Sequence, residues 1–239
     1  MDTIKIESKQ TKMVAHRGLS GLERENTCAA FIAAGNRDYF GIETDVHVTS
    51  DSQFIIIHDN TTERVAGINL EVEQSTFAQL RELRLPDMDG KVRQDLCLPS
   101  LDEYLRICKK YGKKPVLELK SYIPKKDIAR MLQIVKDTTE PGEMIFISFD
   151  YRNLVALRNL EPEAQLQYLY GQPVDDTLVE QLLACRCDLD IYYPSITKEA
   201  VERLHKKGIL VNCWTVDDPT AAAALVEMGV DFITSNILQ

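Results

Sequence analysis

The chain lacks a long apolar run, and its N-terminal segment, Met1 to Lys12, is polar without the apolar stretch of a signal peptide. We therefore expect a soluble, cytoplasmic protein that does not enter membranes. Positive charge is scarce, because 28 lysines and arginines face 37 aspartates and glutamates, which gives a net charge of -9. Nucleic acid and anionic membrane surfaces repel such a chain, so neither is expected as a partner.

Paired cysteine motifs and a glycine-rich phosphate loop are also missing. Of the six cysteines only Cys185 and Cys187 lie close together, and their C-x-C spacing differs from the paired C-x-x-C spacing of a zinc site. We expect reduced, mostly buried thiols. The lack of a phosphate loop disfavours a doubly wound sheet of the nucleotide-binding kind.

Short apolar or β-branched runs alternate with segments of helical length along the chain. The expected strands are 13–16, 40–46, 115–119, 144–149, 165–170, 188–193, 208–215 and 231–234. The clearest expected helices are 25–36, 125–136, 153–160, 198–207 and 217–228. Eight such units in 239 residues predict an α/β fold, a single (β/α)8 TIM barrel spanning 1–239, with a doubly wound sheet as the alternative.

Two departures from a regular barrel are expected. The connection after the second strand is long, so residues of about 51–99 form a small insertion, preceded by a hairpin-like stretch at 49–57. In a barrel this insertion lies on the catalytic face, where it can shape substrate access. The sequence ends five residues after Thr234, so the final helix is expected to be missing or reduced. Ile4 and Ile6 alternate as in a strand, and this arm is expected to cover part of the barrel bottom.

Three carboxylates are predicted to meet inside the barrel mouth. Glu43 and Asp45 are two residues apart on one strand, so they share a face, and Glu118 ends another strand. Such carboxylates repel one another strongly without a cation. Oxygen ligands without cysteine favour a hard ion, Mg²⁺ or Ca²⁺. Salt bridges to Arg17 and Lys120 are the alternative explanation for any one of them.

The charges of this cluster fit a phosphodiester. Three carboxylates and one divalent cation sum to -1, Arg17 and Lys120 bring the sum to +1, and a phosphodiester makes it neutral. The planar guanidinium of Arg17 can hold two phosphoryl oxygens, whereas Lys120 acts as a point charge.

Two of the four histidines, His16 and His58, lie at predicted strand ends beside the acidic cluster. Imidazole titrates near neutral pH, so one ring can accept a proton while the other donates one. His47 has the same strand parity as Asp45, but a place beyond the barrel rim is favoured, and support of the site from behind is the most that is expected of it. His205 is expected near a helix end, in solvent or beside the helix dipole.

Trp214, the only tryptophan, is predicted to form an apolar wall for the alcohol portion of the substrate. Packing beneath the loops is the alternative. Ser148, Phe149 and Tyr170 end other strands and are weaker candidates for lining the pocket.

These residues, in this order, resemble the glycerophosphodiester phosphodiesterase family over nearly the whole chain. The motifs that carry the resemblance are His16-Arg17-Gly18, Glu25-Asn26-Thr27, Glu43-Thr44-Asp45-Val46, His58-Asp59 with Arg64, residues 98–103, Glu118-Leu119-Lys120 and Trp214-Thr215-Val216. The chain departs from the family pattern at Arg24, where proline is usual.

The resemblance implies hydrolysis of glycerophosphodiesters to glycerol 3-phosphate and an alcohol, a reaction of lipid metabolism. It implies a divalent metal on the three carboxylates, His16 and His58 as the acid/base pair, and phosphate binding by Arg17 and Lys120. In related enzymes a glycerol hydroxyl attacks phosphorus, and water opens the cyclic phosphate. The alternatives are a lysophospholipid or other phosphodiester as substrate, and an idle barrel that binds a phosphorylated metabolite. A small molecule is the expected partner, and a homo-oligomer could cover the flank without a final helix.

Overall fold

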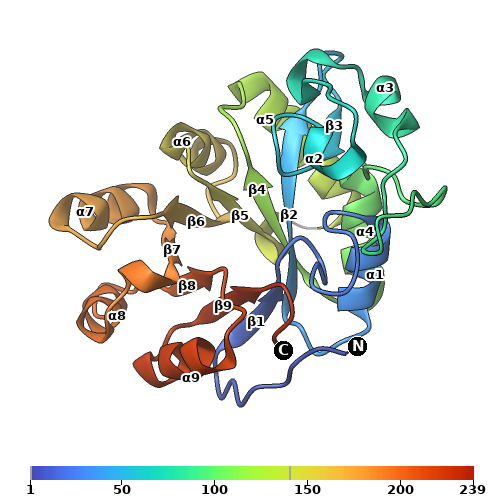
Figure 1. Cartoon of the computed structure of the whole chain (residues 1–239). Helices are drawn as coiled ribbons and strands as arrows, with labels where there is room; N and C mark the ends of the chain where they lie inside the picture. The colour runs from blue at the N-terminus through green and yellow to red at the C-terminus, as the bar shows by residue number, and fades with distance from the viewer. Residues whose placement is uncertain (1, 140) are drawn as a thin grey trace.

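The computed structural model describes residues 2–139 and 141–239. Its strands are β1 (Lys12–Ala15), β2 (Gly41–Val48), β3 (Phe54–Ile56), β4 (Lys114–Leu119), β5 (Ile145–Ser148), β6 (Gln165–Tyr170), β7 (Asp188–Tyr192), β8 (Val211–Trp214) and β9 (Phe232–Ser235). All except β3 pair in parallel, and β1 pairs with both β2 and β9, which closes the ring (Figure 1). The predicted (β/α)8 barrel is confirmed, and ring closure excludes the doubly wound sheet.

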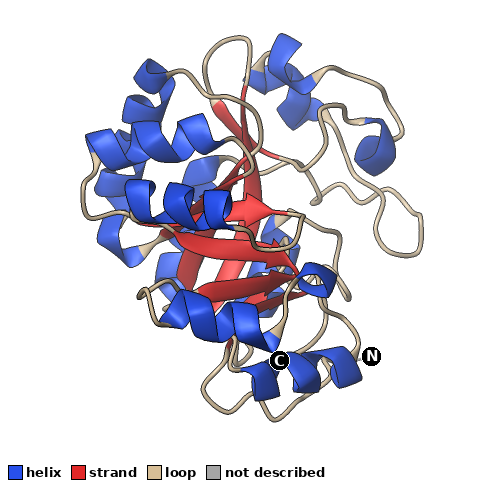
Figure 2. Cartoon of the chain, turned by 90° about the vertical axis from the view of Figure 1, so that its left-hand side faces the viewer, coloured by secondary structure: helices blue, strands red, loops and turns tan. Residues whose placement is uncertain are grey.

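Helices surround this ring, as Figure 2 shows. The outer helices are α1 (Cys28–Gly35), α4 (Leu101–Tyr111), α5 (Lys125–Thr138), α6 (Tyr151–Leu160), α7 (Asp176–Cys185), α8 (Lys198–His205) and α9 (Pro219–Met228), with 3-10 turns η2 (Pro141–Glu143) and η3 (Tyr193–Ser195). Their ends follow local chemistry: Ser100 begins α4 with a capping box, and Gly112 ends it in the left-handed conformation.

The first outer helix begins three residues later than expected. Thr27 caps α1 by accepting a hydrogen bond from the Ala30 amide, so Glu25 and Asn26 precede the helix. Asn26 has a left-handed backbone with φ of 53°. The two residues therefore lie in a loop at the barrel mouth, where their side chains reach the site.

Side-chain alternation along β2 sorts its residues between two environments. Ile42 and Val46 join the core between barrel and helices, whereas Glu43 and Asp45 face the barrel interior. Lower in the barrel the interior is apolar, with a cluster of Val14, Val116, Ile145, Ile147, Leu169 and Phe232. Polar side chains are thus concentrated above this cluster, toward the carboxyl ends of the strands.

The insertion after β2 has a core of its own. β3 folds back antiparallel on β2, and α2 (Glu63–Ala66), η1 (Val72–Gln74) and α3 (Phe77–Glu82) follow (Figure 1). A separate set of buried apolar residues packs beneath them: Ile55, Ile57, Val65, Val72, Leu80, Leu83, Leu85, Leu96 and Leu98. The hairpin was expected, but its first strand is β2 itself, and the rest of the insertion is an organised subdomain.

No helix follows β9 in residues 236–239. The N-terminal arm pairs there instead, since the amides of Ile4 and Ile6 donate to the carbonyls of Ile237 and Gln239. The arm also forms ion pairs with both neighbouring helical regions, Asp2 with Arg37 and Lys9 with Glu227. It therefore lies along the flank between α1 and α9. The arm was expected to cover part of the barrel bottom. Ile6 lies near Lys12 and Phe40, at the amino ends of β1 and β2, and the pairing with the segment after β9 also holds the arm against the flank.

Among the described residues, no helix is both long and apolar enough to cross a membrane.

Candidate active site at the barrel mouth

The three predicted carboxylates meet. Asp45 on β2 lies opposite Glu118 on β4 in the strand register, and Glu43 precedes them on the same inner face. One oxygen from each lies within 4.8 Å of the others, and the three residues are 3%, 1% and 7% exposed. Such a compact, buried, oxygen-only set fits a hard divalent cation.

The positive charges of the protein do not by themselves neutralise this triad of carboxylates. Burial, followed by the charges of Asp45 and Glu118, raises the pKa of Glu43 well above its usual value. Burial and the charge of Asp45 raise the pKa of Glu118 to about 7. Burial opposes ionisation of Asp45 too, but Lys120 and Arg17 outweigh it and hold the pKa of Asp45 low. One carboxylate is thus neutralised by protein cations, and the other two lack sufficient positive charge.

Lys120 contacts two of the three triad carboxylates. Its Nζ lies 2.8 Å from Glu118 Oε1 and 3.4 Å from Asp45 Oδ1. The salt bridge foreseen as an alternative therefore exists, yet it does not keep the Glu118 pKa at its ordinary value. The cation also lines the cavity above the triad, where it can approach an anion.

A tight turn after β1 places Arg17. Its backbone has a φ of 54°, and its amide donates to Glu43 Oε2 at 2.8 Å. The next residue, Gly18, has a φ of 75°, and a Cβ there would lie 2.7 Å from the carbonyl carbon of Ala30. Only glycine fits at that position, because helix α1 approaches so closely.

The guanidinium of Arg17 is already partly engaged. Nη1 donates to Glu25 Oε1 at 2.8 Å, and Nε lies 3.6 Å from Asp45 Oδ2. The guanidinium predicted to bind phosphate is thus held by Glu25 at Nη1, while its buried Nε has no hydrogen-bond partner among the described residues.

His16 follows β1 directly. Its Nδ1 lies 2.8 Å from Asn236 Oδ1, and its Nε2 lies 4.0 Å from Glu43 Oε2. Burial and the positive charge of Arg17 lower the pKa of His16 to about 4. The ring is therefore neutral near neutral pH and able to accept a proton.

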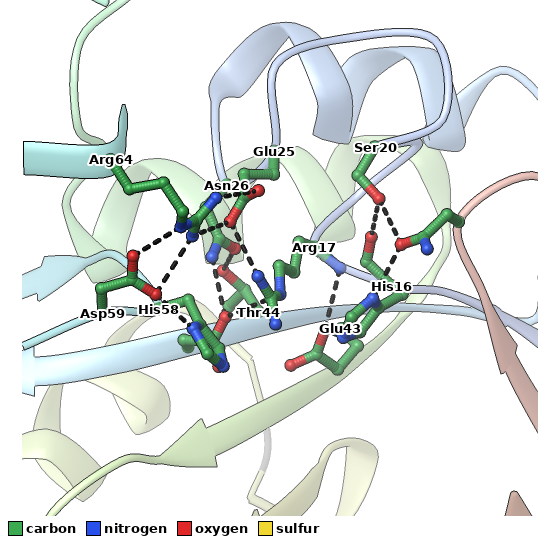
Figure 3. Close-up of polar contacts among 12 residues, drawn as sticks. His16, Arg17, Ser20, Glu25, Asn26, Glu43, Thr44, His58, Asp59 and Arg64 are labelled. Atoms are coloured by element: carbon green, nitrogen blue, oxygen red, sulfur yellow. Dashed lines mark hydrogen bonds and ion pairs between the residues drawn. The ribbon is translucent and has the colours of Figure 1, made fainter. Parts of the chain in front are cut away.

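His58 reaches the same cavity from the loop after β3. Its Nδ1 lies 2.6 Å from Asp59 Oδ1, and burial lowers the pKa of His58. Arg64 holds Asp59 and bridges to both oxygens of Glu25 at 2.8 Å, and Glu25 in turn accepts from Arg17 (Figure 3). This chain of charges links the two halves of the site.

Buried residues support the site from behind. His47 is fully buried, with Nδ1 3.0 Å from Glu73 Oε1 and Nε2 3.4 Å from the His58 carbonyl oxygen. Asn26 donates to Asp45 Oδ2 at 2.8 Å. The sequence favoured a place beyond the rim for His47 and left a supporting position as the alternative; the ring lies against the His58 backbone. His205 lies far from this site, 2.8 Å from Asp231 at the end of α8.

A cavity of about 100 Å³ joins these groups. Its lining is His16, Arg17, Glu43, His58, Glu118, Lys120, Ile147, Phe149, Leu169, Asp190, Trp214, Thr215 and Thr234. Every predicted site residue reaches it except Asp45, which lies 1% exposed beneath the others. Sequence reasoning thus found most of the polar lining.

Trp214 forms one wall of the cavity, as predicted. Its ring contacts Phe149 edge-on, with centroids 5.6 Å apart, and its Nε1 donates to the Asp190 carbonyl oxygen at 3.2 Å. Two weaker candidates do not line the cavity. Ser148 is buried and donates to the Leu119 carbonyl oxygen, and Tyr170 packs beside Tyr168.

Asp190, Asn236 and the Asp59–Arg64–Glu25 chain were given no role in the sequence reasoning. Asp190 could have been found by alternation, because Leu189 and Ile191 are core residues and Asp190 must point to the other face. The Arg64–Glu25 contact joins residues 39 positions apart, and no local pattern predicts it.

Comparisons with known proteins agree with this geometry. The sequence matches the model of the Glycerophosphoryl diester phosphodiesterase family over residues 16–238. It is 28% identical over 233 residues to a glycerophosphodiester phosphodiesterase of Caldanaerobacter subterraneus, covering 95% of this chain and 94% of the relative.

Solved structures agree as well. An Oleispira antarctica phosphodiesterase, determined with its product sn-glycerol-3-phosphate, superimposes with a TM-score of 0.87 and 26% identity over 98% of this chain and 96% of that one. A Parabacteroides distasonis glycerophosphodiester phosphodiesterase superimposes with a TM-score of 0.79 and 29% sequence identity, covering 95% of this chain and 93% of that one. The resemblance seen in the sequence is confirmed: this chain belongs to the glycerophosphoryl diester phosphodiesterase family.

Proposed function

We propose that this protein hydrolyses glycerophosphodiesters to glycerol 3-phosphate and an alcohol, with a divalent cation and the pair His16 and His58. The observation that carries the proposal is one small cavity lined by His16 and His58, two cations and two of three clustered carboxylates. Its family relatives act on such diesters by name, and one was solved with glycerol 3-phosphate.

Glu43, Asp45 and Glu118 would hold the cation. Burial, and then the neighbouring carboxylates, raise the pKa values of Glu43 and Glu118, and a bound cation would favour their charged forms. Carboxylate oxygens favour Mg²⁺ or Ca²⁺ over softer metals. When bound, such an ion supplies positive charge that stabilises a phosphoryl group gaining negative charge.

Arg17 and Lys120 would bind the phosphate. In the described part of the chain the buried Nε of Arg17 has no hydrogen-bond partner, with Asp45 Oδ2 3.6 Å away, and a phosphoryl oxygen would satisfy it. Lys120 lines the same cavity while it contacts Glu118. Because Glu25 accepts a hydrogen bond from Nη1, the guanidinium is orientated before the substrate arrives.

The two histidines would move protons. Asp59 contacts Nδ1 of His58, and Asn236 contacts Nδ1 of His16, so each ring has its Nε2 left for the cavity. One ring would accept the proton of the attacking hydroxyl on its Nε2. The other ring would have to be an imidazolium, with a proton on Nε2, to protonate the departing alcohol. Trp214 would pack against carbon atoms of the substrate.

A substrate panel tests this function. Purified protein is assayed with glycerophosphocholine, glycerophosphoethanolamine and lysophosphatidylcholine, after chelation and after return of Mg²⁺ or Ca²⁺. We expect glycerol 3-phosphate from the first two, lost with chelator and restored by metal. Turnover of lysophosphatidylcholine alone would indicate the lysophospholipid alternative, and binding of glycerol 3-phosphate without any turnover would indicate an idle barrel.

A further inference from the structure

Asp190 is a carboxylate in the cavity that the proposed chemistry does not use. It lies on β7, which stands across the ring from β2, the strand that carries Glu43 and Asp45. The cavity therefore extends from the triad and the cations on one side to Asp190 on the other.

Asn212 lies within hydrogen-bond reach of the Asp190 carboxyl group, but among the described residues Asp190 has no cation beside it like those that satisfy the other acids of the site. Asp190 is 2% exposed, and its Oδ1 is buried with no hydrogen-bond partner among the described residues. Lys120 contacts Glu118 and Asp45, and the Arg17 amide contacts Glu43, but no cation pairs with Asp190 in the described chain. A buried polar atom without a partner is costly and commonly marks a place that a ligand fills.

The surroundings of Asp190 limit what that ligand can be. Ile147, Leu169 and Trp214 line the cavity beside it, so the ligand must carry carbon as well as a polar group. Burial and the charge of Glu118 raise the pKa of Asp190 well above its usual value, which disfavours a second anion there. A hydroxyl suits the site, because it can donate to a carboxylate or accept from a carboxyl group.

We propose that Asp190 recognises glycerol by hydrogen bonding its terminal free hydroxyl, the one farthest from the phosphate. The inference rests on the proposed function for the position of the phosphate beside Arg17 and Lys120. From there the three-carbon chain crosses the cavity along Ile147, Leu169 and Trp214. The Trp214 indole donates to the Asp190 carbonyl oxygen, and this hydrogen bond fixes the position of the Trp214 ring relative to Asp190.

The test removes the hydroxyl from the substrate and the carboxyl from the protein. Two phosphodiesters of one alcohol are compared, one with glycerol and one with propane-1,2-diol, which keeps the middle hydroxyl and lacks the terminal one. The natural protein should favour the glycerol diester in kcat/KM by about 10- to 100-fold. Asp190→Leu should reduce that preference to about 3-fold or less, since the apolar side chain cannot pair with the hydroxyl.

Asp190→Asn keeps hydrogen-bonding capacity and should keep most of the preference. The matched control is Asp188→Asn on the same strand, whose carboxylate accepts from the Leu210 amide and does not line the cavity. It should behave as the natural protein. If leucine prevents folding, Asp190→Ala makes the same comparison without added bulk.

The proposal is overturned if the natural protein uses both diesters equally, or if Asp190→Leu or Asp190→Ala keeps the preference. Calorimetry with glycerol 3-phosphate and propane-1,2-diol 1-phosphate gives a second measurement that needs no turnover. Inactivity on every glycerophosphodiester would refute the proposed function, and the calorimetric preference would then decide the role of Asp190 separately.

Discussion

The side-chain oxygen of Asn236 lies 2.8 Å from Nδ1 of His16. The orientation of this amide is set by its nitrogen, which donates to Asp217 Oδ2 at 2.6 Å. An amide oxygen can only accept, so Nδ1 carries the proton of the neutral ring. His16 therefore presents an unprotonated Nε2 toward Glu43 and the cavity.

Replacing Asn236 tests this relationship. Asn236→Ala frees the ring to turn and to change tautomer, and kcat should fall by about 10- to 100-fold. Asn236→Asp keeps an acceptor but adds negative charge, which favours the imidazolium and raises the pKa of His16 above about 4. The acid limb of the pH profile of kcat/KM should then move to higher pH. A profile that overlays that of the natural protein would contradict the assignment.

The two histidines should be individually necessary for turnover. His16→Ala and His58→Ala each remove a proton-transfer group, so turnover should fall by at least about 10²-fold while circular dichroism and the melting temperature show an intact fold. His205→Ala is the control, because that ring lies by Asp231 outside the site. Near-normal activity in either site variant would refute the assignment.

Removing one triad carboxylate should separate metal binding from stability. Glu43→Gln deletes a ligand charge, so calorimetry should show weaker binding of Mg²⁺ and Ca²⁺. The same change relieves repulsion among buried carboxylates, so the melting temperature with chelator should not fall. Glu82→Gln, at an exposed position on α3, should bind metal normally. Undiminished affinity in Glu43→Gln would show that this residue holds no cation.

Arg64 should stabilise the fold in a pH-dependent way. Burial alone would raise the pKa of Glu25, but Arg64 and Arg17 lower it to about 2, and hydrogen bonds from Arg64 lower that of Asp59 to about 2. A lowered acid pKa stabilises the fold above the unfolded value, about 4 for these groups, and the contribution is lost as pH falls toward 2.

Arg64→Gln should therefore cost about 1 kcal/mol of unfolding free energy near neutral pH, a modest value because the arginine is half-exposed. The difference from the natural protein should shrink below pH 4 and with added salt. Urea unfolding at a series of pH values measures it. A difference that stays constant from pH 7 to pH 2 would mean that Arg64 acts through packing alone.

Strand order and helix placement could be read from the sequence because apolar periodicity reflects burial directly. Glu43 and Asp45 were found because alternation on a strand is strict. The start of α1 was placed too early, since Glu25 and Asn26 suit a helix locally but are held by Arg17, Arg64 and Asp45. At these two residues, side-chain contacts with distant residues outweigh the local preference for a helix.

Other features depend on partners that no pattern of spacing reveals. The insertion reads as polar and mixed, yet its scattered apolar residues, such as Ile55, Leu80 and Leu96, form one buried cluster. Asn236 was overlooked because an isolated asparagine after a strand is common, and only the approach of His16 gives it a role. Contacts between residues that are distant in the sequence create both features.

The pairing of the N-terminal arm with the segment after β9 has a consequence for engineering. Thr3 hydrogen bonds with Gln239, so the two ends of the described chain are neighbours on the flank between α1 and α9. A linker of a few residues would span them. The chain could then be joined into a circle and reopened in a surface loop, such as the exposed residues Pro162 and Glu163 between α6 and β6, leaving the barrel mouth intact.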